Sequence, residues 1–524
     1  MKKTFVFWLF GILLLLFAGC QKDNIVLVDM ITTSDDESDD IANTTFAQTV
    51  SVTFSANGEA SVTGTDEDFN VTMNGNDVTI VYSGEEHIMY ELSGSATDGF
   101  FKLYSSSKQG ITLNSLNLIN PNGAAINVQG PTETPNKGKR TFIVLKGANT
   151  LADGTSYTDT PSTEDEKAVL FGEGQFVISG SGSLEVNASG KSGIMSDDYL
   201  HFVSGTITVN TTTSVSASNG DTLKPACIKA NDYIKMTGGT LNLTSSGTGA
   251  KGISSDGYGI FRGGVVNVTV TGGNFGSSGV GGGFPGGGQS SSNGVKAKGM
   301  KFDGNLTFTG GTVIVKATSH EGIESKGTIS ISGGEVYSYS QSDDAINSGG
   351  DLTISGGYVF AHSAGNDGLD ANGNCYIKGG VVFAIGSSSP EVAIDANTEG
   401  GYKLYVEGGT IIAVGGLESG ASLSQRCYSA SSWSQNTWYA LSIGFAVYAF
   451  KTPSSGGTPL VVSCSSTPTL KSGVSAEGSN IFFQGMLYEN ASFSGGTEVS
   501  LSSYSGGNGG GGGPGGGGPG GGPF

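Results

Sequence analysis

Short runs of alternating apolar and polar residues recur along this chain, and in its second half they return at a fixed interval. The Gly-Gly pairs that end at Gly311, Gly334, Gly357 and Gly380 are 23 residues apart. After each pair, apolar side chains occupy alternate positions, as in the run 335–338 (EVYS). Such alternation predicts short, half-buried strands. A constant interval of this size predicts units that stack because none can bury its apolar side alone.

Each unit holds two further strand-like segments. One lies just before the Gly-Gly pair, as in Ile329–Ile331, and the other is an earlier tripeptide, as in Ile323–Ser325. Three strands per turn, each parallel to its counterpart about 4.8 Å away, predict a right-handed parallel β-helix, a single-stranded solenoid with three strands per coil. A leucine-rich repeat has a similar period, but the regular Leu and Asn framework that it requires is absent. The sequence therefore predicts an all-β fold of this kind.

The N-terminus predicts export and lipid attachment. Lys2 and Lys3 precede an apolar stretch, and the run 17–20 (FAGC) resembles a bacterial lipobox, so Cys20 is the predicted site of lipidation. The apolar stretch is shorter than the roughly 20 residues of a membrane-spanning helix, which makes a transmembrane anchor the weaker alternative. We therefore expect a protein attached by lipid to the outer membrane or cell surface.

Changes in composition and period divide the chain into predicted segments. They are a lipoprotein signal peptide at 1–19, an acidic tether without stable structure at 20–45, an N-terminal β cap at 46–100, the parallel β-helix at 101–416 with a Gly-rich insertion at 277–293, a C-terminal β cap at 417–504, and a Gly/Pro-rich tail without stable structure at 505–524.

Charge excludes one class of partner. The formal net charge is −20, and loss of residues 1–19, which hold two lysines and no acid, would make it −22. No basic patch is visible that could neutralise phosphates, so nucleic acid is excluded as a partner. Besides Cys20 there are four cysteines, at positions 227, 375, 427 and 464, and their pairing cannot be chosen from sequence.

Aligning the units on their tripeptide strand brings acidic residues into columns. Glu321, Asp344 and Asp367 form one column, Glu324, Asn347, Asp370 and Asp395 a neighbouring one, and Asp343 and Asn366 lie beside them. The same frame in an earlier unit falls on 293–296 (NGVK) and holds no acid. Two carboxylates about 5 Å apart repel by roughly 3 kcal/mol at an effective dielectric constant of 20. Oxygen donors from adjacent turns suit Ca²⁺, so we predict calcium here; the alternative is a set of solvated turn residues without a ligand.

A second column is aromatic. The strand after each Gly-Gly pair should point its third residue outward, which predicts an exposed stripe that includes Tyr337, Phe360 and Phe383, with Tyr339 two places further on. Sugar rings stack on aromatic faces, so a polysaccharide track is the functional interpretation. The alternative is that the C-terminal cap or the Gly-rich insertion covers the stripe.

These features resemble a bacterial family of lipid-anchored or cell-surface parallel β-helix proteins described as carbohydrate-binding. The resemblance covers residues from about 100 to 470 and rests on Gly-Ile turns such as Gly322-Ile323, on the strands after the Gly-Gly pairs, and on the run 461–468 (VVSCSSTP). It implies a fold similar to that of pectate lyases, with Ca²⁺ and acidic polysaccharides such as polygalacturonate as ligands.

The resemblance also implies a ligand pattern, Asp-Asp-x-x-Asp with an acid from the previous coil. Residues 343–347 (DDAIN) with Glu321, and 366–370 (NDGLD) with Asp344, each match it with one Asn in place of an acid. A lyase would also need a Lys or Arg base, and Lys326, Lys378 and Lys403 lie outside the matched pattern. We therefore expect calcium-dependent binding of an anionic polysaccharide without catalysis. The alternatives are a polysaccharide lyase acting by β-elimination and a structural or adhesive surface protein.

Overall fold

The computed structural model describes residues 37–158, 164–218, 221–276 and 294–506. The chain forms two compact units, residues 1–44 and 45–524. The described part of the first unit contains two 3-10 turns, η1 (Glu37–Asp39) and η2 (Ile41–Asn43), and the Asp40 carboxylate caps η2 by accepting from the N–H of Ala42 at 2.9 Å. In the second unit, regular structure is almost entirely strand, which confirms the all-β prediction.

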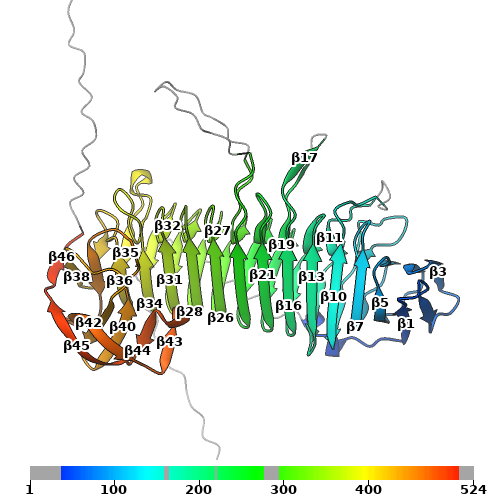
Figure 1. Ribbon diagram of the computed structural model, residues 1–524, viewed down its shortest axis with the longest axis horizontal. Coiled ribbons are helices and arrows are strands. Elements are labelled where there is room, and N and C mark those ends of the chain that lie inside the picture. The colour runs from blue at the N-terminus through cyan, green and yellow to red at the C-terminus, as the bar shows by residue number, and fades with distance from the viewer. Residues whose placement is uncertain (1–36, 159–163, 219–220, 277–293, 507–524) are drawn as a thin grey trace, which may run out of the picture. The chain divides into compact units, whose positions relative to one another are not determined.

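The largest sheet contains 26 strands, most of them short. Figure 1 shows its longer strands side by side in chain order. All strands of this sheet are β1 (Gln48–Phe54), β2 (Ser61–Thr63), β5 (Ile88–Ala96), β7 (Gln109–Asn120), β9 (Thr141–Lys146), β10 (Ala148–Asp153), β12 (Phe176–Gly180), β13 (Ser183–Ala188), β15 (Leu200–Phe202), β16 (Thr206–Thr211), β20 (Tyr233–Met236), β21 (Thr240–Ser245), β23 (Tyr258–Phe261), β24 (Val265–Val270), β26 (Leu306–Ala317), β28 (Ile329–Ser340), β30 (Leu352–Ile354), β31 (Tyr358–Ser363), β33 (Cys375–Ile377), β34 (Val381–Ile385), β35 (Leu404–Val406), β36 (Thr410–Val414), β37 (Ser422–Leu423), β38 (Cys427–Ala430), β41 (Leu460–Ser463) and β46 (Ser502–Tyr504).

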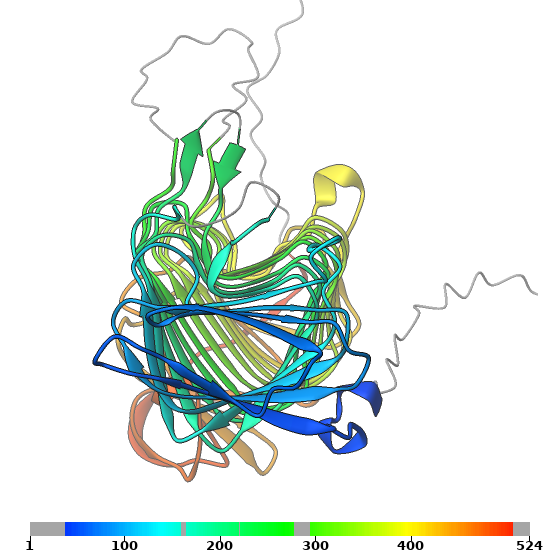
Figure 2. The same ribbon diagram turned by 90° about the vertical axis from the view of Figure 1, so that its right-hand side faces the viewer.

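A second sheet of 12 strands follows chain order, and beyond its first hairpin all its neighbours are parallel. Viewed along the stack, successive turns of the chain lie over one another (Figure 2). The strands are β3 (Phe69–Asn74), β4 (Asp77–Tyr82), β6 (Phe100–Ser105), β8 (Ile126–Gln129), β11 (Ala168–Gly172), β14 (Ser192–Ser196), β19 (Ala226–Ala230), β22 (Lys251–Ser255), β25 (Met300–Phe302), β27 (Ile323–Ser325), β29 (Ile346–Ser348) and β32 (Leu369–Ala371).

The register of the strands follows the interval seen in the sequence. Ile323 of β27 pairs with Ile346 of β29, which pairs with Leu369 of β32, in steps of 23 residues. These three side chains are fully buried in one continuous hydrophobic core. Because each contributes roughly 1.5–3 kcal/mol by burial, the column of apolar residues holds successive turns in register.

The predicted fold class, a right-handed parallel β-helix built as a single-stranded solenoid with three strands per coil, is wrong. The strands join into the 26-stranded and 12-stranded sheets and two smaller sheets. At the Gly-Gly pairs ending at Gly311 and Gly334 the chain bends without ending the strand, so that β26 and β28 each continue for 12 residues, whereas at Gly357 and Gly380 the strand does end. Gly311 takes φ 79°, and a Cβ there would lie 2.8 Å from the backbone of Gly263, so only glycine fits this close stacking.

Six strands between residues 438 and 499 form a separate antiparallel sheet. Its strands are β39 (Trp438–Ile443), β40 (Ala446–Lys451), β42 (Thr469–Glu477), β43 (Asn480–Phe482), β44 (Leu487–Glu489) and β45 (Ser492–Val499). A two-stranded sheet, β17 (Ser216–Ser218) and β18 (Asp221–Leu223), and two 3-10 turns, η3 (Thr398–Gly400) and η4 (Phe483–Gly485), complete the described structure.

Candidate functional site

Main-chain hydrogen bonds place five charged residues of the 12-stranded sheet in one column. The N–H groups of Gly252, Gly299, Gly322 and Ala345 donate to the carbonyls of Lys298, Glu321, Asp344 and Asp367 in turn, at 3.1–3.2 Å. The order along the stack is therefore Lys251, Lys298, Glu321, Asp344, Asp367, each two residues before the central apolar residue of its rung. The column changes sign between the second and third members.

Lys298 neutralises the first two acids of the predicted calcium site. Its Nζ lies 3.1 Å from Glu321 Oε2 and 2.6 Å from Glu324 Oε2, and all three side chains are largely buried. An ammonium bridging two carboxylates in a poorly solvated place is a strong, charge-assisted contact. Glu321 and Glu324 are therefore parts of an ion-pair network.

His320 links Glu321 to Asp343 of the next rung. Its Nδ1 contacts the Glu321 carboxylate and lies 2.8 Å from Asp343 Oδ2. Burial lowers the pKa of His320, but its hydrogen bonds to the two carboxylates outweigh this and raise the pKa to about 9, so the imidazole is charged at neutral pH. The ligand atoms of these three residues lie within 4.8 Å of one another, a spacing that a metal ion could also bridge.

Burial and the nearby cations act in opposite directions on the pKa values of Glu321 and Asp343, and the cations prevail in both. Burial raises the pKa of Glu321, yet the His320 hydrogen bond and the charge of Lys298 bring its net value below the ordinary range. For Asp343, burial is likewise outweighed by His320, and its pKa is lowered. Asn366 adds to this by donating from Nδ2 to Asp343 Oδ1 at 3.2 Å. These carboxylates are ionised and already compensated by protein cations.

Asp344, Asp367 and Asp370 form a second group with different electrostatics. Asn347 joins two of them, because its Nδ2 donates to Asp344 Oδ2 at 2.8 Å and to Asp370 Oδ2 at 2.7 Å. Asp344 Oδ1 accepts from the N–H of Asp367 at 3.2 Å, and Asp367 Oδ1 accepts from the N–H of Val392 at 2.6 Å. No described lysine or arginine forms an ion pair with these three aspartates, so their charge is compensated only by neutral donors.

Burial and crowding raise the pKa values of the three aspartates in this second group. Burial first, and then the charge of Asp370, raises the pKa of Asp344 to about 8. Burial together with Glu391 and Asp370 raises the pKa of Asp367 to about 7. Burial raises the pKa of Asp370 to about 6, despite a hydrogen bond with Asp395. Without an added cation, Asp344 therefore stays mostly protonated at pH 7, whereas Asp367 is close to its pKa and Asp370 is mostly ionised.

The last rung adds Glu418, a residue that the sequence did not indicate, to the acidic group. Ile394 pairs in parallel with Leu369 and with Leu417, which brings Asp395 beside Asp370 and Glu418. Burial and a hydrogen bond with Glu418 raise the pKa of Asp395 to about 9. Glu418 lies beyond the region where the 23-residue interval is visible, and no sequence signal marks it.

The structure thus divides the predicted calcium ligands in two. Glu321, Glu324 and Asp343 are paired with Lys298 or His320, whereas Asp344, Asn347, Asp367, Asp370 and Asp395 converge without a protein cation. Lys298 and His320 were missed by sequence reasoning. His320 could have been found because it directly precedes the first acid of the column, but Lys298 could not, since the Gly-rich insertion obscures its register.

The predicted aromatic track is wrong at two of its four residues. Phe360 and Phe383 are fully buried, because the six-stranded sheet covers them: the ring of Phe483 lies 5.4 Å from that of Phe360, and Phe450 lies 5.5 Å from Phe383. Tyr337 is partly buried and stacks face to face on Phe360 at 4.7 Å. A ring whose face is occupied by its neighbour offers no platform there for a sugar.

Further contacts fix this cover in place. The N–H of Phe483 donates to Glu335 Oε1 at 2.7 Å, and the hydroxyl of Tyr358 donates to Glu489 at 2.7 Å. Tyr339 is partly exposed and meets the edge of His362 at 5.1 Å. The second interpretation of the stripe, a surface covered by the chain's own C-terminal segment, is the one that these contacts favour.

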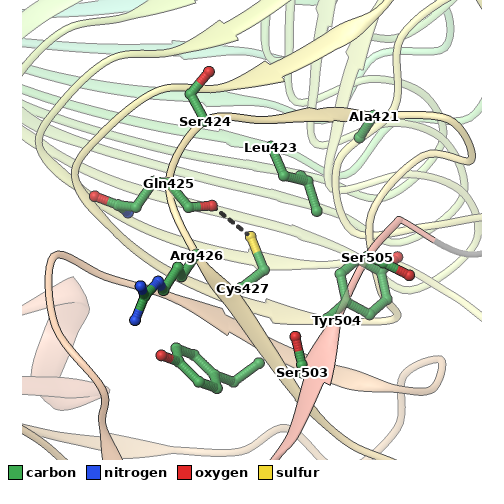
Figure 3. A pocket seen from close by; sticks show the side chains of 10 residues that line it. Ala421, Leu423, Ser424, Gln425, Arg426, Cys427, Ser503, Tyr504 and Ser505 are labelled. Atoms are coloured by element: carbon green, nitrogen blue, oxygen red, sulfur yellow. Dashed lines mark hydrogen bonds between the residues drawn. The ribbon is translucent and has the colours of Figure 1, made fainter.

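A separate pocket of about 410 Å³ lies beside β37, β38 and β46 (Figure 3). Arg426, Tyr428 and Tyr504 contribute to its lining, and Gln425 holds one wall by donating from Nε2 to Gly409 O at 2.8 Å. No acidic side chain of the described residues lines it. None of the acids of the acidic site lines this pocket, so the two are separate.

Other predictions concern residues outside this site. The four cysteines at positions 227, 375, 427 and 464 are free, buried thiols. Within the described residues, no helix has the length and apolar character needed to span a membrane. The signal peptide, Cys20, the insertion at 277–293 and nearly all of the tail at 505–524 lie outside the described residues.

The fold and the site define a class: an all-β repeat protein whose stacked parallel strands present buried oxygen donors on one sheet. The chain belongs to the family of carbohydrate-binding domain-containing proteins, because the family model of that description matches residues 74–368, more than half of its length. None of the curated proteins matches the chain.

A solved structure described as a polysaccharide lyase-like protein from C. thermocellum, in a gadolinium derivative, is similar at 16% identity. The match covers 59% of this chain and 100% of the solved chain, with a TM-score of 0.33. A TM-score this low supports no conclusion about fold or function.

Proposed function

We propose that this chain is a surface lipoprotein that binds an anionic, uronate-containing polysaccharide of the pectin type through calcium, without catalysis. One observation carries the proposal: Asp344, Asp367 and Asp370 are crowded and largely buried, and no described lysine or arginine pairs with them. Membership in a carbohydrate-binding family supports a glycan as the partner. Lipid attachment at Cys20 and a location on the outer membrane or cell surface remain predictions from the sequence.

The donor set of this group fits calcium. It consists of carboxylate oxygens from two adjacent rungs and the side-chain amide of Asn347, which can offer its Oδ1 instead of its Nδ2 after a rotation of the amide. Calcium accepts six to eight oxygen ligands in flexible geometry, and a site that keeps a ligand position open can share the ion with an outside carboxylate. When bound, the ion would supply the positive charge that joins an acidic protein to an acidic polysaccharide.

Catalysis by β-elimination is the alternative, and the contacts of the nearest lysines speak against it. A base must be unprotonated beside the cation. The Nζ of Lys298 is occupied by the carboxylates of Glu321 and Glu324. Lys326 lies 2.8 Å from Asp303, and the hydrogen bond with this acid raises its pKa. Both amino groups are therefore engaged by acids of the protein and are not free to take a proton from a substrate.

The test combines metal titration with glycan binding. Metal-stripped protein should give calorimetric heat with Ca²⁺ and should bind polygalacturonate in Ca²⁺ but not in EDTA. The double variant Asp344→Asn/Asp367→Asn should lose both properties, whereas Asp98→Asn, which removes an exposed acid elsewhere, should retain them. Binding that persists in EDTA would overturn the proposal, and a negative glycan array in Ca²⁺ would favour a structural or adhesive protein.

A further inference from the structure

Five lysines gather on the rungs just before the acidic group. Around Lys251 lie Lys301, Lys298, Lys224 and Lys229, named in order of their effect on its charge. The whole chain has 26 lysines and arginines against 46 acids. These four lysines are the charges that act most on Lys251, and two of them, Lys298 and Lys301, are paired with acids.

Lys251 itself is the unusual member. Its side chain is 8% exposed, in the same column as Lys298 and one rung away from it. No hydrogen bond or ion pair to its ammonium group is found among the residues that the structure describes. Burial, followed by the charges of Lys301 and Lys298, lowers its pKa to about 8. The side chain is buried as a whole, but its Nζ is not among the fully buried polar atoms without a partner, so the ammonium group reaches the surface with no protein contact there.

The neighbouring lysines differ in how far they are compensated. Lys298 is held by Glu321 and Glu324, and Lys301 lies 2.6 Å from Asp303. Lys229 forms no ion pair within the described part of the chain; burial lowers its pKa, although the charges of Asp256 and Asp197 oppose this. Lys251 and Lys229 therefore remain available for an outside anion, and they lie on adjacent rungs, β22 and β19.

We propose that Lys251 and Lys229 form a direct binding site for an oxyanion, namely a carboxylate of the polysaccharide whose other carboxylates calcium bridges at the acidic group. This inference rests on the proposed function and extends it. The two sites share one sheet: Lys251 precedes Glu321 by two rungs and Asp344 by three, which is about 15 Å at strand spacing. A polysaccharide lying along the stack would meet lysines first and calcium next.

The two sites lie one after the other along the stack and bind carboxylates by different chemistry. Lysine ammonium groups bind a carboxylate without a metal, whereas the acidic group binds one only through calcium. A short uronate oligomer that reaches one site only should bind less tightly than one long enough to reach both, because the second contact becomes intramolecular. Methyl esterification of the carboxylates should abolish both contacts.

The experiment measures polygalacturonate oligomers of two lengths on the full chain in Ca²⁺. Lys251→Met and, separately, Lys229→Met should weaken binding of the long oligomer by about tenfold, with Ca²⁺ affinity unchanged in calorimetry. Lys146→Met removes an exposed lysine of β9 and is the matched control, expected to bind as wild type. Because Lys251 has no partner to lose, Lys251→Met should melt at or above the wild-type temperature without ligand; a lower melting temperature would indicate a structural role and overturn the inference.

Sulfate provides the second arm, since a small oxyanion offers the same chemistry as a sugar carboxylate. It should raise the melting temperature of wild type but not of Lys251→Met. If sulfate acts in this way while wild type does not bind polygalacturonate, the proposed function fails and the polysaccharide assignment fails with it. If wild type binds polygalacturonate in a calcium-dependent way and both lysine variants bind equally well, the lysine site alone is refuted.

Discussion

Replacing Asp344 by Asn should stabilise the metal-free protein above neutral pH and weaken its response to calcium. The carboxyl is 4% exposed, and its folded pKa of about 8 compares with an ordinary value of 3.8. A carboxyl whose folded pKa is raised binds its proton more tightly in the folded state. Its contribution to stability is therefore complete below about pH 4 and is lost as the pH rises towards 8.

The size of the effect follows from this difference. At pH 7 the unfolded chain has released the proton and the folded chain has not, so folding is about 4 kcal/mol less favourable than at low pH, counted at 1.36 kcal/mol per pH unit above the ordinary value. The folded unit spans residues 45–524, and an unfolding entropy of about 2.1 cal/mol/K per residue converts this to a change in melting temperature of roughly 4 °C. An amide does not titrate, so Asp344→Asn should lack this loss.

The local contacts allow the substitution. The new amide can still accept from the N–H of Asp367 through its oxygen. The melting temperature of EDTA-treated protein should be followed from pH 4 to pH 8, with and without Ca²⁺, and with Asp98→Asn as the control. Equal pH slopes for wild type and Asp344→Asn would refute the assignment of crowding to this carboxyl. A full calcium response in Asp344→Asn would refute its role as a ligand.

Three further outcomes test other parts of the structure. Phe360→Ala should cost about 3–5 kcal/mol of unfolding free energy, because its ring is buried beneath the six-stranded sheet, and should leave polygalacturonate affinity unchanged; weaker sugar binding at normal stability would show that the ring contacts glycan. Lys298→Met should cost roughly 3–5 kcal/mol in denaturant titrations, because Glu321 and Glu324 lose their buried cation, and a change below about 0.5 kcal/mol would contradict this pairing. Calcium-loaded protein incubated with polygalacturonate should yield no ultraviolet-absorbing unsaturated product, and a calcium-dependent rise in absorbance would establish a lyase.

The interval of 23 residues could be read from the sequence because glycine is required by geometry at each repeat. The close stacking at Gly311 leaves no room for a Cβ, and Gly334, Gly357 and Gly380 have the same close contacts, so the Gly-Gly pairs mark these four turns. The columns that contain Asp344, Asp367 and Asp370 follow from this interval, and the register confirms that their rungs are consecutive. The sheet arrangement could not be read in the same way, because a glycine at positive φ can either end a strand or bend one that continues, as in β28.

Side-chain partners were harder to predict, since they depend on which residues meet across turns. The frame of glycine followed by an apolar residue fits 293–296 (NGVK) as well as 298–301 (KGMK), and a Gly-rich insertion separates these residues from the preceding rung. Backbone pairing selects the second, because Met300 pairs with Ile253 on one side and Ile323 on the other. With this choice Lys298 enters the acidic column, and two predicted calcium ligands become ion-pair partners.

The reversal of sign within one column also determines where a cation is needed. At the boundary, Lys298 and the charged His320 compensate Glu321, Glu324 and Asp343, so an added ion would have to displace existing partners there. One rung further on, Asp344 and Asp370 share only the neutral amide of Asn347. Coulomb repulsion is therefore uncompensated from Asp344 onward and compensated before it, which locates the proposed calcium site at the later rungs and leaves the lysines of the earlier rungs for the anions of the same polymer.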